Sequence, residues 1–157
     1  MSDAAASTVK TVEGGCRCGR VRFRVAGDAL VTMACHCTGC QRMTASAYSL
    51  SGLYPAERFA VIEGAPVLGG LHGPTRHFHC DHCKSWLFTR PEGLDAFVNI
   101  RTTMLDTPMS AAPLFETWTE EALPWAQTGA SYSFPKFPPE ESFGTLVQAY
   151  AESLASG

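Results

Sequence analysis

Residues 35–41 read CHCTGCQ, a stretch in which Cys35, Cys37 and Cys40 occur within six positions. The chain has seven cysteines, and the other four stand at positions 16 and 18 (CRC) and at positions 80 and 83 (CDHC). Their number is odd and the amino terminus does not resemble an export signal, so a set of disulfides is a poor explanation. Scattered cysteines are more often buried as small hydrophobic residues, but clusters at these spacings are typical of metal ligands. The clusters therefore predict a metal-stabilised fold.

Each of the two outer cysteine pairs supplies half of a tetrahedral metal site. Residues i and i+2 of an extended segment face the same side, so Cys16 and Cys18 can present two sulfur atoms to one ion. Cys80 and Cys83 can do the same across a tight turn, as in zinc ribbons. Together the two pairs predict a closed four-cysteine zinc site that joins the first strand to a later hairpin. Closed sites of this kind contribute directly to folding, so its role would be structural.

Cys35, Cys37 and Cys40 then remain as an incomplete tetrahedron. An open fourth position is typical of a zinc ion that does chemistry or receives a ligand. A different pairing, or a histidine that completes the site, are the alternatives. His36 is the least expected ligand, because in an extended segment its side chain points away from those of its neighbours. The candidate histidines are His36, His72, His77, His79 and His82.

The ligand charge of this second centre narrows its chemistry. Three thiolates outweigh the charge of the zinc dication, so the centre would be less able to ionise water than a site of three neutral histidines. It is better suited to binding and deprotonating a thiol, which then attacks an electrophile such as an aldehyde. We therefore expect two zinc ions per chain, one structural and one with an open position.

Three stretches of the chain, in their order, resemble the glutathione-dependent formaldehyde-activating (GFA) family, which includes the centromere protein V relatives and has an Mss4-like fold. They are GGCRCGRVRF (14–23), ACHCTGCQR (34–42) and HCDHC (79–83), with weaker similarity in LDAFVNIRTTMLD (94–106) and FETWTEEALPW (115–125). The resemblance implies the zinc sites described above, with Cys35, Cys37 and Cys40 at the catalytic positions. It also implies a carbon-sulfur lyase activity, the reversible addition of a thiol such as glutathione to formaldehyde or a similar small aldehyde.

The chain departs from the family pattern at two positions. His79 stands where the family commonly has Phe, and Lys84 stands where it commonly has Gly. The usual glycine indicates a turn with positive φ, which lysine tolerates less well, so the local geometry could differ here.

A pocket for glutathione should contain a cation or backbone donors, because this tripeptide carries two carboxylates. Arg42 and Arg101 are the candidates for binding them, and Trp118 and Trp125 could form walls of the pocket. The alternative function is a binding module without catalysis, in which zinc shapes a β scaffold for a protein partner. A redox role for the C-x-x-C thiols is a further, minor alternative.

Short apolar segments separated by glycine and proline predict a mainly β, antiparallel domain. The expected strands are Val21–Val25, Leu30–Ala34, Ala47–Leu50, Phe59–Glu63, Thr75–Phe78, Trp86–Thr89 and Phe97–Ile100. A short helix could begin at Cys40, whereas residues 101–139 show no clear periodicity.

The carboxyl-terminal sequence predicts an amphipathic helix at about residues 140–155 that covers one face of the sheet. Its apolar face comprises Phe143, Leu146, Val147, Tyr150 and Leu154. We expect residues 1–10 to form a disordered tail and residues 11–157 to form a single zinc-binding domain.

The charge of the chain argues against nucleic acid as a partner. Its formal net charge is −3, and affinity for nucleic acid depends on many Lys and Arg residues that neutralise phosphates. No segment approaches the roughly 20 consecutive apolar residues needed to cross a bilayer. We therefore expect a cytoplasmic protein whose partners are a small thiol and a small aldehyde, and a homodimer is compatible with the sequence.

Overall fold

A computed structural model describes residues 8–69 and 74–157 of the chain. Most of the expected tail and the candidate ligand His72 therefore lie outside the described residues. The elements are β1 (Thr11–Gly15), β2 (Arg22–Ala26), β3 (Val31–Cys35), α1 (Thr38–Thr44), β4 (Ser49–Pro55), η1 (Ala56–Arg58), β5 (Phe59–Glu63), β6 (Val67–Gly69), β7 (Arg76–His79), β8 (Trp86–Arg90), β9 (Phe97–Arg101), η2 (Thr102–Met104), β10 (Phe115–Thr117), η3 (Thr119–Glu121), β11 (Tyr132–Ser133), η4 (Glu140–Ser142) and α2 (Phe143–Ala155).

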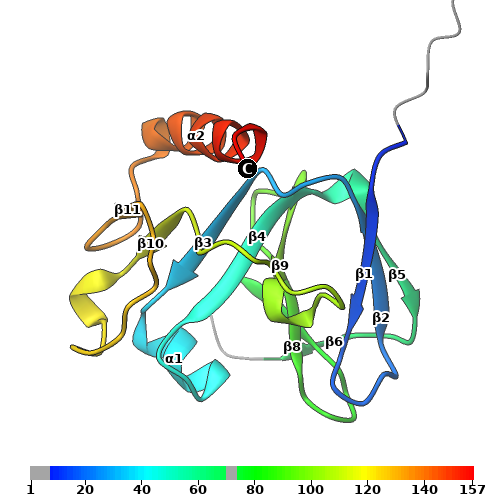
Figure 1. Ribbon diagram of the computed structural model, residues 1–157. Helices are drawn as coiled ribbons and strands as arrows, with labels where there is room; N and C mark the ends of the chain where they lie inside the picture. The colour runs from blue at the N-terminus through cyan, green and yellow to red at the C-terminus, as the bar shows by residue number, and fades with distance from the viewer. Residues whose placement is uncertain (1–7, 70–73) are drawn as a thin grey trace, which may run out of the picture.

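The strands of the described chain form two sheets. The smaller sheet has the order β1-β2-β5, and the larger has the order β11-β10-β3-β4-β9-β8-β7-β6. In Figure 1 the smaller sheet lies on one side of the molecule, and β10 and β11 lie on the other. The prediction of a mainly β fold with a carboxyl-terminal helix is confirmed, and each expected strand overlaps an observed one.

The strands that the sequence did not predict are β1, β6, β10 and β11. Glycine closes β1, and the other three are only two or three residues long. Segments this short carry too little alternation to be recognised from their own residues.

Strand β10 departs from the expected antiparallel arrangement. It pairs in parallel with β3 and with β11, and places Thr117 opposite Cys35. This pairing joins segments about 80 residues apart, so no local pattern in the sequence could indicate it. Its consequence is that the otherwise irregular stretch 101–139 supplies a wall beside the CHCTGCQ segment.

An aromatic cluster joins the two sheets. Phe59 of β5 contacts Phe23 of β2 at 5.6 Å between ring centroids and Phe88 of β8 at 4.8 Å. Phe88 in turn stacks on Phe78 of β7, also at 4.8 Å. Because Phe23 and Phe88 are almost fully buried, these contacts fix the smaller sheet against the strands on either side of the CDHC turn.

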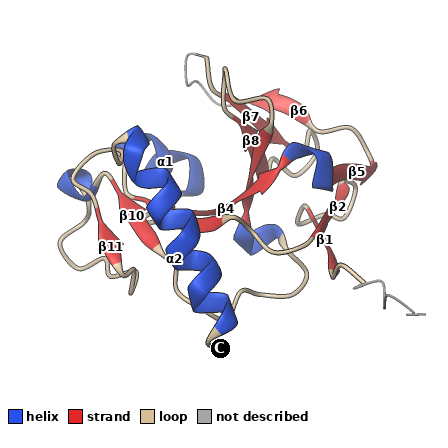
Figure 2. Cartoon of the chain, turned by 90° about the horizontal axis from the view of Figure 1, so that it is seen from above, coloured by secondary structure: helices blue, strands red, loops and turns tan. Residues whose placement is uncertain are grey.

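The carboxyl-terminal helix covers part of the larger sheet. The chain enters it through the 3₁₀ turn η4, which contains Glu140 and Glu141. Leu146 and Tyr150 are buried, whereas Leu154 is 44% exposed. Phe143 packs edge-on against Phe115 of β10 at 6.1 Å. Figure 2 shows α2 across the sheet, where it contacts β3. Among the described residues, no helix combines the length and the apolar character required to cross a bilayer.

A comparison of two glycines tests how tightly the smaller sheet meets the CRC turn. Gly64 and Gly93 have φ values of 73° and 74°, but a Cβ at Gly64 would lie 2.2 Å from the carbonyl oxygen of Arg20, whereas a Cβ at Gly93 meets nothing within 4 Å. We expect Gly93→Ala to lower the free energy of unfolding by about 1 kcal/mol through backbone strain alone. Gly64→Ala should lower it by about 2–4 kcal/mol, since steric overlap adds to the strain. Thermal unfolding of the two zinc-loaded variants measures the loss of stability in each. Equal losses would contradict the close approach of Gly64 to the carbonyl oxygen of Arg20.

Candidate metal centres and the adjoining pocket

Two groups of cysteines have the spacing of metal ligands. In the first group, the sulfur atoms of Cys16, Cys18, Cys80 and Cys83 all lie within 4.8 Å of one another. The Cys16–Cys18 and Cys18–Cys80 sulfur distances are 3.5 and 3.7 Å. Tetrahedral zinc with bonds of about 2.3 Å separates its sulfur ligands by about 3.8 Å. All seven cysteines are free thiols, so these residues could hold a metal ion and fit zinc.

Backbone hydrogen bonds shape the two turns that carry the four-cysteine cluster. The amide of Val21 donates to the sulfur of Cys16 at 3.3 Å, and the amide of Lys84 donates to the carbonyl of Cys80 at 2.9 Å. The amide of Arg17 donates to the hydroxyl of Ser85 at 3.1 Å and so ties one turn to the other. Burial opposes ionisation of Cys83, but hydrogen bonds from Ser85 outweigh it and lower the pKa of Cys83 to about 5. A backbone hydrogen bond at Arg20 favours ionisation of Cys18, but burial and the neighbouring thiols outweigh it and raise the pKa of Cys18 to about 11. Cys83 is therefore the thiol of this cluster that is most readily available as a thiolate, the form that binds metal.

Lys84 adopts the left-handed backbone conformation that its position requires, with φ of 61°. The lysine therefore adopts the positive φ that a glycine at this position indicates. The lysine side chain is 69% exposed and pairs with Asp81 at 3.0 Å.

The second group consists of Cys35, Cys37 and Cys40, whose sulfur atoms also lie within 4.8 Å of one another. Cys35 ends β3, Cys37 is the N-cap of α1, and the amide of Cys40 donates to the Cys37 sulfur at 3.3 Å. Hydrogen bonds from Cys37 and Cys40 lower the pKa of Cys35 to about 2. The same contacts raise the pKa of Cys40, so the negative charge of the cluster is centred on Cys35.

The described histidines do not complete the three-cysteine cluster, because neither metal-ligand group contains one. His36 is almost fully buried, and its Nε2 lies 2.8 Å from a carboxylate oxygen of Glu116 on β10. Its side chain is thus directed away from its cysteine neighbours, as expected for an extended segment.

Two glutamates that the sequence did not single out hold the three-cysteine segment in place. Glu116 binds His36 and accepts hydrogen bonds from Thr128 and Ser133, both at 2.6 Å. Burial would raise the pKa of Glu116, but these bonds lower it, so Glu116 is the acceptor and His36 the donor. Glu121 accepts from the amide of Thr38 at 3.0 Å. In the sequence, only their position in the segment FETWTEEALPW could have drawn attention to these glutamates. Their contacts with the three-cysteine segment depend on the parallel pairing of β10 with β3.

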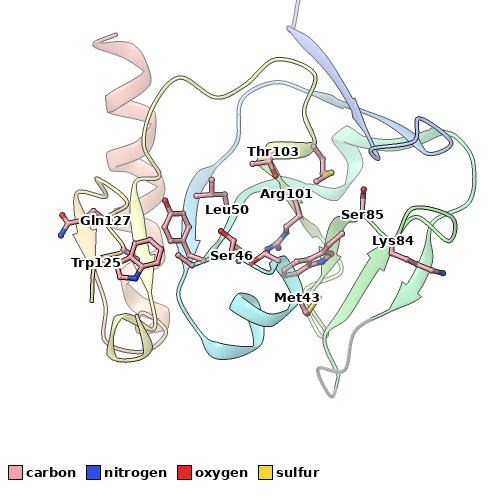
Figure 3. Close-up of a pocket in the computed structure, with 16 residues that line it drawn as sticks. Met43, Ser46, Leu50, Lys84, Ser85, Arg101, Thr103, Trp125 and Gln127 are labelled. Atoms are coloured by element: carbon pink, nitrogen blue, oxygen red, sulfur yellow. The ribbon is translucent and has the colours of Figure 1, made fainter. Parts of the chain in front are cut away.

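A pocket of about 750 Å³ is lined in part by residues that follow Cys40 in α1 and β4 and by residues that follow Cys83 in the chain. Figure 3 shows Arg101 near its centre, with Trp125 and Gln127 at one end and Lys84 and Ser85 at the other. Its lining residues are Met43, Thr44, Ser46, Ala47, Tyr48, Ser49, Leu50, Lys84, Ser85, Trp86, Arg101, Thr103, Met104, Trp125, Ala126 and Gln127.

Of the four residues that the sequence suggested for this pocket, the structure places two in its lining. Arg101 and Trp125 line it, whereas Arg42 is exposed on α1 and, like Trp118, is not among the lining residues. Ser49 connects the pocket to the three-cysteine cluster, since it lines the pocket and pairs with Cys35 across β3 and β4. A ligand in the pocket would therefore lie beside this cluster.

Comparison with known proteins gives one family and one shared fold. Residues 11–121 match the family model described as glutathione-dependent formaldehyde-activating enzyme. A protein of Rhodobacter sphaeroides, known from a structural genomics crystal structure, superposes with a TM-score of 0.50 at 16% identity, over 62% of this chain and 91% of that one. At this identity the likeness concerns the fold alone. No curated protein matches the chain significantly.

The strained lysine gives a prediction for the four-cysteine turn. A residue other than glycine in the left-handed region costs about 1–2 kcal/mol, and the exposed pair with Asp81 returns little of it. We expect Lys84→Gly to raise the midpoint of thermal unfolding of the zinc-loaded protein by about 1–4 °C. Asp81→Asn, which removes only the ion pair, serves as the control and should change it by less. A lower midpoint for Lys84→Gly would contradict the assignment of strain.

Proposed function

Because the chain belongs to the glutathione-dependent formaldehyde-activating enzyme family, we propose that it catalyses the reversible addition of glutathione, or a similar thiol, to formaldehyde or a similar small aldehyde. The reaction is of the carbon-sulfur lyase type. The observation that carries the proposal is the three-cysteine cluster beside a pocket, with no fourth ligand among the described residues. We place zinc at both cysteine clusters, with a structural role for Cys16, Cys18, Cys80 and Cys83.

Zinc held by Cys35, Cys37 and Cys40 would bind an incoming thiol and favour its deprotonation. Contacts within the chain hold the segment at which we place the reaction. Cys37 caps α1, Glu116 binds the preceding residue His36, and Glu121 accepts a hydrogen bond from the following residue Thr38. Ser49 pairs with Cys35 across β3 and β4 and also lines the pocket.

The proposed reaction needs no oxidant or reductant. The thiol sulfur forms a bond to the aldehyde carbon, the π electron pair of the carbonyl moves to oxygen, and the oxygen takes up a proton. The product is the S-hydroxymethyl adduct, and the reverse reaction breaks the same bond. We propose Arg42 and Arg101 as contacts for the carboxylates of the substrate. Arg101 is the better candidate, because it lines the pocket and Arg42 does not.

Replacement of one ligand in each cluster separates the catalytic from the structural role. Cys37→Ala should lose one zinc ion per chain and reduce the rate of adduct formation at least about 100-fold, because it removes the reacting centre. Exchange between ¹³C-formaldehyde and glutathione, followed by NMR, measures the rate.

Cys83→Ala is the matched comparison in the other cluster. It should lower the unfolding midpoint by about 10 °C or more, since a closed zinc site contributes folding free energy. Undiminished adduct formation by Cys37→Ala would sink the zinc-thiolate mechanism. If the protein with both zinc ions neither binds thiol nor accelerates the reaction, the non-catalytic binding module becomes the better explanation.

A further inference from the structure

Arg101 is a buried cation at the end of β9. The residue is only 8% exposed, and no carboxylate of the described chain forms an ion pair with it. Its Nη2 donates one long hydrogen bond, of 3.4 Å, to the hydroxyl of Thr89. Burial lowers the pKa of Arg101 to about 10, which still leaves the guanidinium charged at neutral pH. Because a buried charge is costly unless opposite charge lies nearby, the source of that opposite charge matters.

The three-cysteine cluster is the source of this opposite charge. Cys35 is paired with Ser49 across β3 and β4. Arg101 is paired with Ser51 across β4 and β9. Paired residues of antiparallel strands, and residues i and i+2 of one strand, point to the same side, so Cys35 and Arg101 lie on one face of the sheet. Negative charge on Cys40 and then Cys35 opposes the larger effect of burial on the pKa of Arg101.

The position of the guanidinium relative to the sheet is fixed. Its carbon lies 4.0 Å from the ring centre of Trp86, which is a close cation–π contact. Trp86 donates in turn to the hydroxyl of Thr89 at 3.2 Å, the same oxygen that accepts from Arg101. These contacts hold the charge in the interior, where solvent screens it little.

The other cation of the pocket is placed differently. Lys84 also lines the pocket, but its side chain is 69% exposed and paired with Asp81. Figure 3 shows this side chain extending away from Arg101. Solvent therefore screens the charge of Lys84, and Arg101 is the lining residue whose charge can act on the cluster at full strength.

The ligand charge of the cluster shows what Arg101 can contribute. Three thiolates, from Cys35, Cys37 and Cys40, exceed the charge of a zinc dication by one negative charge. A thiolate as fourth ligand would make this excess two, whereas a neutral fourth ligand would leave it at one. A fixed positive charge close by offsets the added repulsion only when the fourth ligand is an anion.

We propose that Arg101 is the counter-charge of the three-cysteine centre and that it favours a thiolate over a neutral molecule as the fourth ligand. This inference rests on the proposed function. It applies equally to thiols that carry no carboxylate, so it is distinct from a contact between Arg101 and the substrate carboxylates. The thiol releases its proton to solvent when its sulfur binds. Since Arg101 acts through the cluster, it is a positioning residue.

The test follows the visible spectrum of the cobalt(II)-substituted protein during titration with 2-mercaptoethanol, which has no carboxylate, and with imidazole, which is a neutral ligand. In Arg101→Gln the dissociation constant for 2-mercaptoethanol should rise about tenfold or more, because the counter-charge is lost. The dissociation constant for imidazole should change less than about threefold. The cobalt spectrum of the four-cysteine cluster is the internal control for folding and should be the same in both proteins.

Two further variants separate charge from packing. Arg101→Lys keeps the charge and should bind 2-mercaptoethanol more tightly than Arg101→Gln does. Arg90→Gln is the matched control: Arg90 also lies over aromatic rings, those of Phe59 and Phe88, but does not line the pocket, so this variant should bind both ligands as the unmodified chain does. Equal losses in Arg101→Lys and Arg101→Gln, or equal weakening of both ligands in Arg101→Gln, would overturn the proposal.

Glutathione in the same titration distinguishes failure of this inference from failure of the proposed function. If Arg101→Gln weakens glutathione but leaves 2-mercaptoethanol unchanged, Arg101 is a carboxylate contact only, and the counter-charge is wrong while the function stands. If neither thiol changes the cobalt spectrum of the unmodified chain, the proposed function itself fails.

Discussion

The meeting of the CRC turn with the CDHC turn is the constraint on which the site depends. Cys18 and Cys80 are 62 residues apart in sequence, yet their sulfur atoms lie 3.7 Å apart. A metal at this point would close a long loop of the unfolded chain, which stabilises the folded state. The same turn leads into Trp86, and Trp86 supports Arg101 at 4.0 Å. The four-cysteine cluster, to which we assign a structural role, thus leads directly into the residue that supports Arg101 in the pocket where we place the substrate.

The three-cysteine segment depends on a different long-range contact, the parallel pairing of β3 with β10. This pairing carries Glu116 to His36 and brings Glu121 to the start of α1. Glu116 also binds Thr128, close to Trp125 and Gln127 on the wall of the pocket. One carboxylate therefore couples the position of the cysteines to that of the wall, and the otherwise irregular stretch 101–139 gains a defined role.

The sequence was most informative where the determinants are local. Cysteine spacing predicted both thiol groups, and alternation or apolar periodicity predicted the longer strands and the final helix. It could not predict β10, because three residues of strand are recognisable only through their partner. The sequence suggested Arg101 and Arg42 equally as contacts for a carboxylate, since a sequence pattern alone does not distinguish a buried arginine from an exposed one. Their difference arises from tertiary packing against Trp86 and Thr89.

The most direct measurement of the central claim is the visible spectrum of the cobalt(II)-substituted protein during a titration with glutathione. Cobalt reports both the number of thiolate ligands and a change of coordination. We predict two tetrahedral, thiolate-bound cobalt ions per chain, of which one changes its spectrum saturably as glutathione occupies the open position beside Cys35, Cys37 and Cys40. A spectrum that does not respond to thiol would mean that this position is closed or absent, and would contradict an enzyme that activates thiols there.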